Sequence, residues 1–519
     1  MSADAPGRKA APRADGGPVA DIGLLLEGTY PYISGGVSSW VHQIVRAFPE
    51  HRFALAFLGS TPEDYGEMKY VLPDNVVHLE SHYIHSASAR PPVRAEAGDP
   101  GAYALVERLH RYFRDSQRKD DGVVGEALAA LSSAGRLSDA SFLYSRASWD
   151  YVTAQYREHS RDPSFIDYFW TVRTMHQPLW MLARVAESFP PVRAYHTVST
   201  GYAGFLAAML RWKTGRPLLL SEHGIYTKER KIDLFQSEWI KDNRDPFDRD
   251  PAEIGYLRQL WIRFFESLGR MCYAAADDIV SLYEANRQRQ IADGAPPGKT
   301  RSIPNGIDLP RLSALRAQRA ADDPPPVLCL LGRVVPIKDV KTFIRAMRVV
   351  VNRLPAAEGW IAGPEDEDPE YAEECRALAA SLGVAEKVKF LGFQKIDALL
   401  PKVGLLVLSS ISEALPLVVL EGYAAGVPCV ATDVGSCRQL VHGLEGEDAA
   451  LGTSGRVVGI ADPAALASAA LELLEPARWR AAQAAGIARV ERYYTQDRMF
   501  GAYRALYDKA LSAATAAAT

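Results

Sequence analysis

Short apolar runs alternate with helical segments along most of this chain, and this alternation restricts its possible folds more than any other feature. In the first half, we expect strands at 21–26, 53–58, 76–79, 194–197, 217–221 and 278–282, and a long helix at 239–273. In the second half, we expect strands at 327–331, 359–362, 388–391, 405–408, 428–432 and 455–458. Strands that alternate with helices form parallel sheets covered by helices on both faces. The sequence therefore predicts a doubly wound α/β fold.

A chain of 519 residues is too long for one ordinary hydrophobic core, so the sequence predicts two large domains. Charged residues, alanine and three consecutive prolines between 314 and 326 mark the boundary. The predicted segments are a disordered leader at 1–20, an N-terminal Rossmann-like domain at 21–315, a C-terminal Rossmann-like domain at 316–490, and at 491–519 a helix that packs back on the N-terminal domain, followed by a short tail. A mainly helical insertion at about 86–190 is expected to cover a face of the first domain or to shape a second substrate's pocket.

The composition excludes several classes of protein. The formal net charge is −4, so the overall charge does not attract nucleic acid or anionic lipid. The five cysteines contain no Cys-x-x-Cys pair, which favours core residues in a reducing compartment over disulfides or a zinc site. The leader lacks the apolar segment of a signal peptide, and proline, glycine and Glu421 interrupt the longest apolar stretch, at 414–432. We therefore expect a cytoplasmic protein that reaches a membrane only through a partner.

Two cations and two carboxylates follow predicted strands of the second domain. Arg333 and Lys338 come just after the strand at 327–331, and Glu413 and Glu421 come after the strand at 405–408. In open α/β sheets, ligands bind at the carboxyl ends of the strands. A guanidinium and an ammonium can together neutralise a diphosphate leaving group, and a carboxylate can accept hydrogen bonds from both ribose hydroxyls. The alternative is a set of solvated surface side chains, with Glu421 on a helix whose first turn holds Pro416.

Two motifs in the first domain also suggest ligand contacts. Gly35-Gly36 precedes a predicted helix at 37–48, where a backbone without side chains can approach phosphate oxygens closely. His223, in the sequence 221–225 after a predicted strand, can hydrogen-bond a sugar hydroxyl or an acceptor, although a lone histidine is more often structural.

Other motifs are weaker. Gly35-Gly36 is not part of a Gly-x-Gly-x-x-Gly motif, and the absence of this dinucleotide-binding motif counts against a Rossmann oxidoreductase. Gly298-Lys299-Thr300 resembles the end of a P-loop, but Asp293 stands where that motif needs a glycine, so ATP hydrolysis is excluded. The run at 228–231 is interpreted as a solvated charge cluster, and the acidic triplet at 366–368 as surface and not as a metal site.

Taken together, these motifs resemble glycosyltransferase family 4, whose members have the GT-B fold of two Rossmann-like domains facing a cleft. The resemblance rests on Gly35-Gly36, the segment 304–308, Arg333 with Lys338, the pair Glu413-x7-Glu421, and Gly435. Within this family, the segments 26–40 and 221–226 are similar to the cytosolic transferases of Pel exopolysaccharide biosynthesis.

The resemblance implies a retaining hexosyltransferase with a UDP-sugar donor and with no metal or other cofactor. It implies that Arg333 and Lys338 bind the diphosphate, that Glu421 holds the ribose, and that Glu413 has a positional role near the transferred sugar. It places Gly36 near the phosphates. The implied catalytic residues are Glu413, His223, Arg333 and Lys338. The implied nucleotide-sugar-binding residues are Gly35, Gly36, Asn305, Arg333, Lys338, Gly392, Phe393, Glu413, Leu417 and Glu421, with Gly392 and Phe393 near the base.

The resemblance also implies partners. These are a growing polysaccharide or oligosaccharide acceptor and a Pel-type complex at the inner membrane, with neither nucleic acid nor a direct membrane span. The donor remains open between UDP-glucose and a UDP-N-acetylhexosamine. The alternatives are a transferase like starch or glycogen synthase or of the sucrose type, and a non-catalytic subunit that binds a sugar nucleotide and regulates a membrane synthase.

Overall fold

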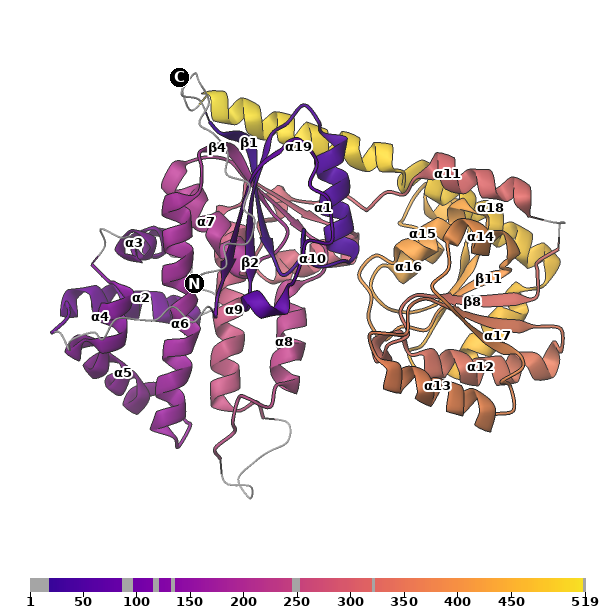
Figure 1. Ribbon diagram of the computed structural model, residues 1–519, viewed down its shortest axis with the longest axis horizontal. Helices are drawn as coiled ribbons and strands as arrows, with labels where there is room; N and C mark the ends of the chain where they lie inside the picture. The colour runs from indigo at the N-terminus through magenta and orange to yellow at the C-terminus, as the bar shows by residue number, and fades with distance from the viewer. Residues whose placement is uncertain are drawn as a thin grey trace. The chain divides into compact units, whose positions relative to one another are not determined.

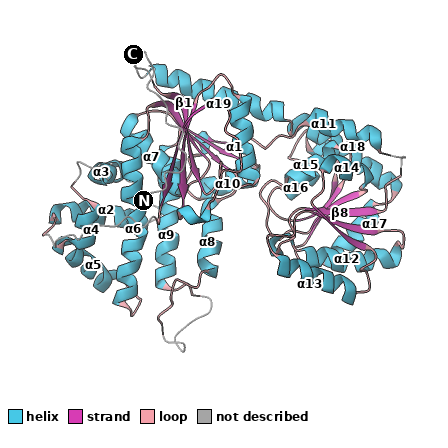
Figure 2. Cartoon of the chain, in the orientation of Figure 1, coloured by secondary structure: helices cyan, strands magenta, loops and turns pink. Residues whose placement is uncertain are grey.

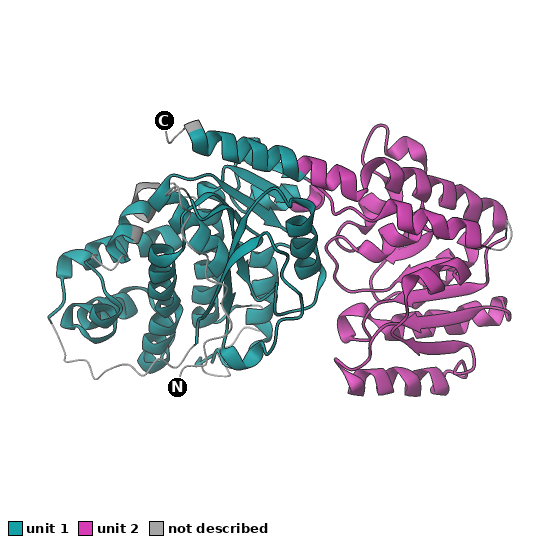
Figure 3. Cartoon of the chain, turned by 45° about the horizontal axis from the view of Figure 1, so that its top comes forward, with its two compact units in different colours: residues 1–281, 287–302, 503–519 teal, residues 282–286, 303–502 magenta. Residues whose placement is uncertain are grey.

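Two compact units make up the chain in its computed structural model (Figures 1 and 3). The structure describes residues 18–85, 97–114, 121–131, 136–244, 253–319 and 323–516. Unit 1 comprises Met1–Ser281, Arg287–Ser302 and Tyr503–Thr519, and unit 2 comprises Leu282–Asn286 and Ile303–Ala502. In each unit, a parallel sheet lies between layers of helices (Figure 2). The predicted class, two Rossmann-like α/β domains, is therefore confirmed.

The sheet of unit 1 has the strand order β3-β2-β1-β4-β5-β6-β7, so the direction of winding reverses between β1 and β4. Its strands are β1 (Ala20–Glu27), β2 (Phe53–Gly59), β3 (Val76–Tyr83), β4 (Val192–Thr197), β5 (Leu218–Glu222), β6 (Asp278–Ser281) and β7 (Thr300–Ser302). The sequence missed β7, because its three residues contain no apolar side chain. The predicted leader is also too long: 1–17 lie outside the described residues, but Ala20 already pairs with Val192.

Helices cover this sheet and fill the predicted insertion. The helices of unit 1 are α1 (Gly36–Ala47), α7 (Tyr202–Thr214), α8 (Tyr226–Gln236) and α9 (Tyr256–Ala275), and the insertion contains α2 (Pro100–Arg114), α3 (Asp121–Leu131), α4 (Asp139–Tyr144), α5 (Arg146–His159) and α6 (Phe165–Ser188). Helix α10 (Glu284–Ala292) follows β6. The long helix predicted at 239–273 was wrong at its start, since 239–244 is not helical and α9 begins at Tyr256 after Gly255.

The sheet of unit 2 has the order β10-β9-β8-β11-β12-β13, with its reversal between β8 and β11. Its strands are β8 (Val327–Leu331), β9 (Glu358–Ala362), β10 (Val388–Gly392), β11 (Leu405–Leu408), β12 (Cys429–Thr432) and β13 (Gly455–Val458). Its helices are α11 (Leu309–Ser313), α12 (Val340–Arg353), α13 (Pro369–Ser381), α14 (Ile396–Leu399), α15 (Leu417–Ala424), α16 (Cys437–His442), α17 (Pro463–Leu473) and α18 (Pro476–Tyr493).

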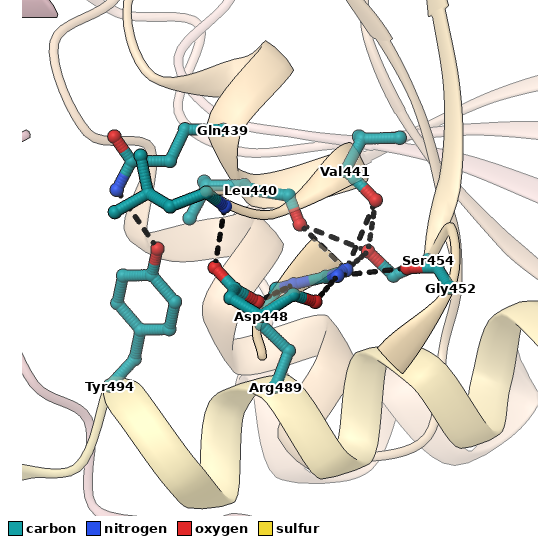
Figure 4. A network of polar contacts seen from close by, with 9 residues as sticks. Gln439, Leu440, Val441, Asp448, Gly452, Ser454, Arg489 and Tyr494 are labelled. Atoms are coloured by element: carbon teal, nitrogen blue, oxygen red, sulfur yellow. Dashed lines mark hydrogen bonds and ion pairs between the residues drawn. The ribbon is translucent and has the colours of Figure 1, made fainter. Parts of the chain in front are cut away.

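A buried arginine holds together one end of unit 2 (Figure 4). Arg489, on α18, has no exposed surface, and its Nε donates to Asp448 at 2.7 Å. Its other nitrogens donate to the carbonyl oxygens of Val441 at 3.0 Å and Gly452 at 2.8 Å and to the Ser454 hydroxyl at 2.9 Å. One guanidinium therefore hydrogen-bonds oxygen atoms at the end of α16 and in the loop between α16 and β13.

The C-terminal helix α19 (Gln496–Ala516) contributes residues to both units. From Tyr503 onward it belongs to unit 1, where the Tyr503 hydroxyl donates to Ser221 at 3.0 Å. The Tyr507 hydroxyl lies 2.8 Å from Nδ1 of His196, whose Nε2 lies 2.9 Å from the same Ser221 hydroxyl. All four side chains are buried, so α19 completes the core beneath β4 and β5.

The main boundaries between the two units lie near residues 302 and 503, whereas the sequence placed the domain boundaries near 315 and 490. No helix in the part of the chain that the structure describes is both long and apolar enough to cross a membrane.

Candidate functional site

The predicted site residues of unit 2 gather in the loops after its strands. Arg333 and Lys338 follow β8, Glu413 follows β11, and Gly392 ends β10. Strands β8 and β11 are neighbours in the sheet, and the chain leaves them in opposite directions. A reversal of this kind opens a crevice at the carboxyl edge, which is where ligands bind in open α/β sheets.

An ion pair lies at this reversal. The Lys338 ammonium contacts the Glu413 carboxylate at 2.5 Å, and the Ser410 hydroxyl donates to the same carboxylate oxygen at 2.6 Å. The Ser409 hydroxyl donates to the backbone oxygen of Lys338 at 2.9 Å. The two side chains of the ion pair are only 21% and 13% exposed, so solvent screens their charges less than those of surface pairs. The structure thus brings together one predicted cation and one predicted carboxylate.

Backbone geometry holds the lysine in place. Lys338 ends the 3-10 turn Pro336–Lys338, and Asp339 follows with a φ of 45°. Aspartate tolerates this left-handed conformation, and its carboxylate accepts a hydrogen bond from the Thr342 N–H at the start of α12. The Ile411 N–H donates to the Ile337 oxygen at 2.9 Å, which joins the loops after β8 and β11.

Gly435 explains the close packing around Glu413. Its φ is +54°, and a Cβ atom at this position would lie 2.3 Å from the Glu413 oxygen and 2.4 Å from the Ala414 oxygen. Only glycine fits both the conformation and the space. The next residue, Ser436, donates its N–H to the Ala414 oxygen at 2.8 Å. The turn after β12 therefore supports the loop that carries the carboxylate.

Arg333 forms an ion pair with an acidic residue of unit 2. Its guanidinium pairs with Glu367, 2.6 Å from both carboxylate oxygens, and about half of each side chain is exposed. The acidic triplet is thus not simply solvated, since Asp368 also accepts a hydrogen bond from the Tyr371 N–H at the start of α13. Among the residues that the structure describes, no group of three or more His, Cys, Asp or Glu side chains could hold a metal ion.

Glu421 lies in the helix that follows the Glu413 loop. It lies in α15, which begins at Leu417 with Pro416 as its N-cap. Its carboxylate makes no hydrogen bond to any described residue. Burial raises the pKa of Glu421 to about 7; Arg311 opposes this shift and Asp397 adds to it.

The other predicted binding residues of unit 2 differ in how far they are buried. Phe393 is 76% exposed, Gly392 has a φ of 61°, and Leu417 is half-buried. Asn305 is buried, and its Oδ1 atom has no hydrogen-bond partner. The buried Ser436 hydroxyl, which the sequence did not indicate, also lacks a partner. Unpaired buried polar atoms are costly, so both mark positions where a ligand could supply the missing hydrogen bond.

The predicted site residues of unit 1 lie after β1 and β5. A Cβ atom on Gly35 or Gly36 would meet nothing within 4 Å, so packing does not explain why glycine stands there. Because these glycines have no side chains, the N–H groups at the start of α1 are left uncovered. His223 is buried with its ring centroid 4.5 Å from that of Trp40, and its Nε2 has no partner. Burial lowers the pKa of His223 to about 4, so its ring is neutral near pH 7 and can hydrogen-bond a hydroxyl.

Comparison with known sequences gives two family matches and a set of relatives. Residues 20–298 match a domain of unknown function (DUF3492), and residues 325–476 match glycosyl transferases group 1. A D-inositol 3-phosphate glycosyltransferase of Salinispora arenicola is 31% identical over 342 residues, or 64% of this chain and 71% of that protein. The protein of the same name from Acidothermus cellulolyticus is 31% identical over 261 residues, and the match spans 47% of this chain and 56%, about half, of that relative's length.

Solved structures match nearly the whole chain. Sucrose-phosphate synthase of Thermosynechococcus elongatus superposes with a TM-score of 0.55 at 16% identity, covering 95% of this chain and 100% of that one. Anabaena HepE, solved in complex with UDP, superposes with a TM-score of 0.55 at 15% identity, covering 94% and 100%. At such low identity, the likeness extends to the fold alone.

Proposed function

The chain belongs to the group 1 glycosyltransferases, which have the GT-B fold, and on this basis we propose that it transfers a sugar from a UDP-sugar to a glycan acceptor. The observation that carries the proposal is the Lys338–Glu413 pair at the strand reversal of unit 2, with Arg333 on the same loop as the lysine. Complexes of HepE with UDP and with UDP-glucose support a uridine diphosphate donor.

In the proposed reaction, the bond between the anomeric carbon and the diphosphate oxygen breaks. An acceptor hydroxyl oxygen bonds to that carbon, and its proton passes to a diphosphate oxygen or to solvent. Negative charge grows on the leaving diphosphate, and Arg333 and Lys338 are the cations placed to stabilise it. Glu413 orients the lysine and lies near the sugar, whereas Glu421 accepts hydrogen bonds from the ribose. No covalent nucleophile, metal or cofactor is part of the proposal.

For the pathway, we propose a Pel-type exopolysaccharide, with UDP-glucose or a UDP-N-acetylhexosamine as donor. The motifs at 26–40 and 221–226 support this choice. We place the protein in the cytoplasm, recruited by partners to the inner membrane. A second candidate acceptor is an inositol phosphate, which the names of the curated relatives favour.

A screen of UDP-sugars tests the proposed function. The purified protein is expected to bind UDP-glucose or a UDP-N-acetylhexosamine in calorimetry and to release UDP from one of them when an acceptor is supplied. Oligosaccharides and inositol 3-phosphate, offered in parallel as acceptors, distinguish the two candidate pathways. Binding without any turnover would instead indicate the regulatory subunit, and a protein that binds no UDP-sugar would contradict the proposal.

The raised pKa of Glu421 predicts a pH-dependent donor affinity. In the free protein this carboxyl titrates at about pH 7, and only its ionised form offers a charged acceptor to the ribose. UDP-glucose affinity is therefore expected to increase about tenfold from pH 6 to pH 8, because the ionised fraction increases by about that factor. Folding has the opposite dependence, since the stability associated with a raised carboxyl pKa is lost as the pH rises through 7.

Calorimetry at several pH values measures this effect. The diphosphate diester of UDP-glucose does not titrate in this range, so it adds no pH dependence of its own. In Glu421→Gln, the affinity should be lower at pH 8 and flat with pH. If Glu421→Gln keeps the wild-type pH dependence of UDP-glucose affinity, a group other than Glu421 causes that dependence and the prediction is wrong.

A further inference from the structure

A cavity of about 640 Å³ lies among the helices of the insertion in unit 1. Helices α2 and α5 and the first halves of α6 and α9 form most of its wall, and α2 and α6 each contact both α5 and α9. No described residue of a strand lines it. It shares no lining residue with another cavity of unit 1, which includes Glu27 and Arg230. Its volume lies within the range of pockets that hold small organic ligands.

Four arginines line this cavity, and two of them are paired with carboxylates. The Arg114 guanidinium lies 2.9 Å from the Glu107 carboxylate. The Arg244 guanidinium lies 2.8 Å from Asp242 and 2.8 Å from Glu253. The charges of these two arginines are therefore balanced within the protein.

The other two arginines, Arg161 and Arg263, are unpaired. Neither guanidinium forms a hydrogen bond or an ion pair with any residue that the structure describes. Arg161 is exposed in the turn between α5 and α6, whereas Arg263 is half-buried on α9. A lone arginine on an open surface needs no partner but water. Two on the wall of one concave cavity instead place two forked cations where a single anion can meet them.

Three charged side chains of this cavity lie near the Tyr256 hydroxyl, at the start of α9. Burial raises the pKa of Tyr256, whereas the positive charges of Arg114 and Arg263 oppose this rise and the Asp162 carboxylate adds to it. Only nearby charges shift a pKa in this way, so the three groups face one part of the cavity. The unpaired Arg263 thus lies close to other polar groups of the wall.

Two histidines of the wall add no positive charge to that of the arginines. The Nε2 atoms of His110 and His176 lie 2.8 Å apart, and Nδ1 of His176 donates to the Val172 oxygen at 2.6 Å. Burial lowers the pKa of both rings, that of His176 to about 4. Both rings are therefore neutral near pH 7.

The same wall offers acceptors for hydroxyl groups. Asp162 is only 5% exposed, and its carboxylate accepts from the Asn243 amide at 3.0 and 3.2 Å and from the Ser164 N–H at 2.8 Å. These donors are neutral, and the two oxygens retain capacity for further bonds. The Gln259 side chain has no hydrogen-bond partner among the described residues. A ligand that carries hydroxyl groups beside its charged group fits this combination.

We propose that this cavity binds a phosphate monoester of a small hydroxylated compound, with Arg161 and Arg263 binding the phosphate and with Asp162 and Gln259 binding the hydroxyls. A phosphate monoester carries a charge of about −1.5 to −2 at pH 7, which matches two unpaired guanidiniums better than a carboxylate does. The ligand would link α2 and α6 of the insertion to α9, which leads into β6. The proposal does not depend on the proposed transfer.

Calorimetry on the full chain tests the proposal with glucose 6-phosphate and glycerol 3-phosphate as probes. At least one of these esters is expected to bind, about tenfold or more tightly than glucose or glycerol, which lack the charge-assisted hydrogen bonds. Gluconate, whose single carboxylate carries less charge, should bind more weakly than glucose 6-phosphate. The bound ester should slow hydrogen exchange in α2, α6 and α9 and leave α12 of unit 2 unchanged.

The variants Arg161→Gln and Arg263→Gln each remove one unpaired charge and break no contact with a described residue. Each should weaken ester binding about tenfold, the effect of losing one charge-assisted hydrogen bond. Arg157→Gln is the matched control, because Arg157 is an exposed arginine of α5 that does not line the cavity. It should leave ester affinity within about twofold of wild type, and all three variants should keep wild-type UDP-glucose affinity within the same factor.

The outcomes separate the two proposals. If neither ester binds, if glucose or gluconate binds as tightly as glucose 6-phosphate, or if Arg161→Gln and Arg263→Gln bind the ester as wild type does, the cavity proposal is wrong and the proposed transfer remains. If these two variants lose UDP-glucose affinity as well, the arginines act on the donor and the cavity proposal is again wrong. If an ester binds with the expected losses but no UDP-sugar binds, the cavity proposal holds and the proposed transfer is wrong.

Discussion

Replacing Arg333 by alanine is expected to slow sugar transfer about 100-fold or more, the usual effect of losing one preorganised donor that stabilises charge in the transition state. The reason is the position of Arg333 after β8, on the loop that also carries Lys338. Steady-state kinetics with a saturating UDP-sugar measures the loss in kcat. The fold should survive, because the side chain is half exposed and its only ion pair or side-chain hydrogen bond among the described residues is with Glu367.

The ion pair of Arg333 provides a matched control. If the only role of Arg333 is a structural ion pair with Glu367, then Glu367→Gln should slow sugar transfer as much as Arg333→Ala does. If Arg333 acts on the diphosphate, Glu367→Gln should leave transfer within about threefold of wild type, because an exposed ion pair contributes little by itself. Equal losses in the two variants, or normal transfer by a well-folded Arg333→Ala protein, would contradict the assignment.

Replacing Arg489 by methionine is expected to lower the free energy of unfolding by about 3–5 kcal/mol. This is the usual cost of removing one partner of a buried ion pair and leaving the other charge uncompensated. Methionine fills much of the space but leaves the Asp448 carboxylate buried and unpaired. It also leaves the Gly452 oxygen without its donor (Figure 4). Urea denaturation followed by circular dichroism measures the loss.

Arg492, one turn further along α18, is the control for this experiment. It pairs with Glu447, but its side chain is 49% exposed and that of its partner is 77% exposed. Arg492→Met should therefore change stability by less than about 1 kcal/mol. Similar losses at both positions would show that the buried network does not stabilise unit 2 more than a surface pair does.

Most of the sheet architecture could be predicted because a strand buried on both faces forms a continuous apolar run. Val327–Leu331 and Leu405–Leu408 stand out for this reason, and both are strands. Strand β7 could not be found, since Thr300–Ser302 is polar and is a strand only through its pairing with β6. Helix α18 was also missed, because it follows α17 after only Leu474 and Glu475 and carries alanine and arginine without a clear apolar stripe.

The sequence could indicate which loops of unit 2 meet, but not every ion pair within them. Loops after neighbouring parallel strands must meet, so Lys338 and Glu413 could be expected near each other, and they form an ion pair. The pairing of Arg333 with Glu367 depends on how the loop after β9 turns, which no local pattern records. Arg230 and Trp261 come from different helices, so only the folded chain brings them together beside one cavity of unit 1.

The path of α19 has a consequence for synthesis on the ribosome. Unit 1 begins at the N-terminus, yet its core around Ser221 and His196 lacks two hydrogen-bonding partners until Tyr503 and Tyr507 have been made. Domains generally fold in the order in which they emerge. Unit 1 is therefore an exception, because the Ser221 and His196 side chains stay without these partners on the nascent chain until residues 503–507 have emerged.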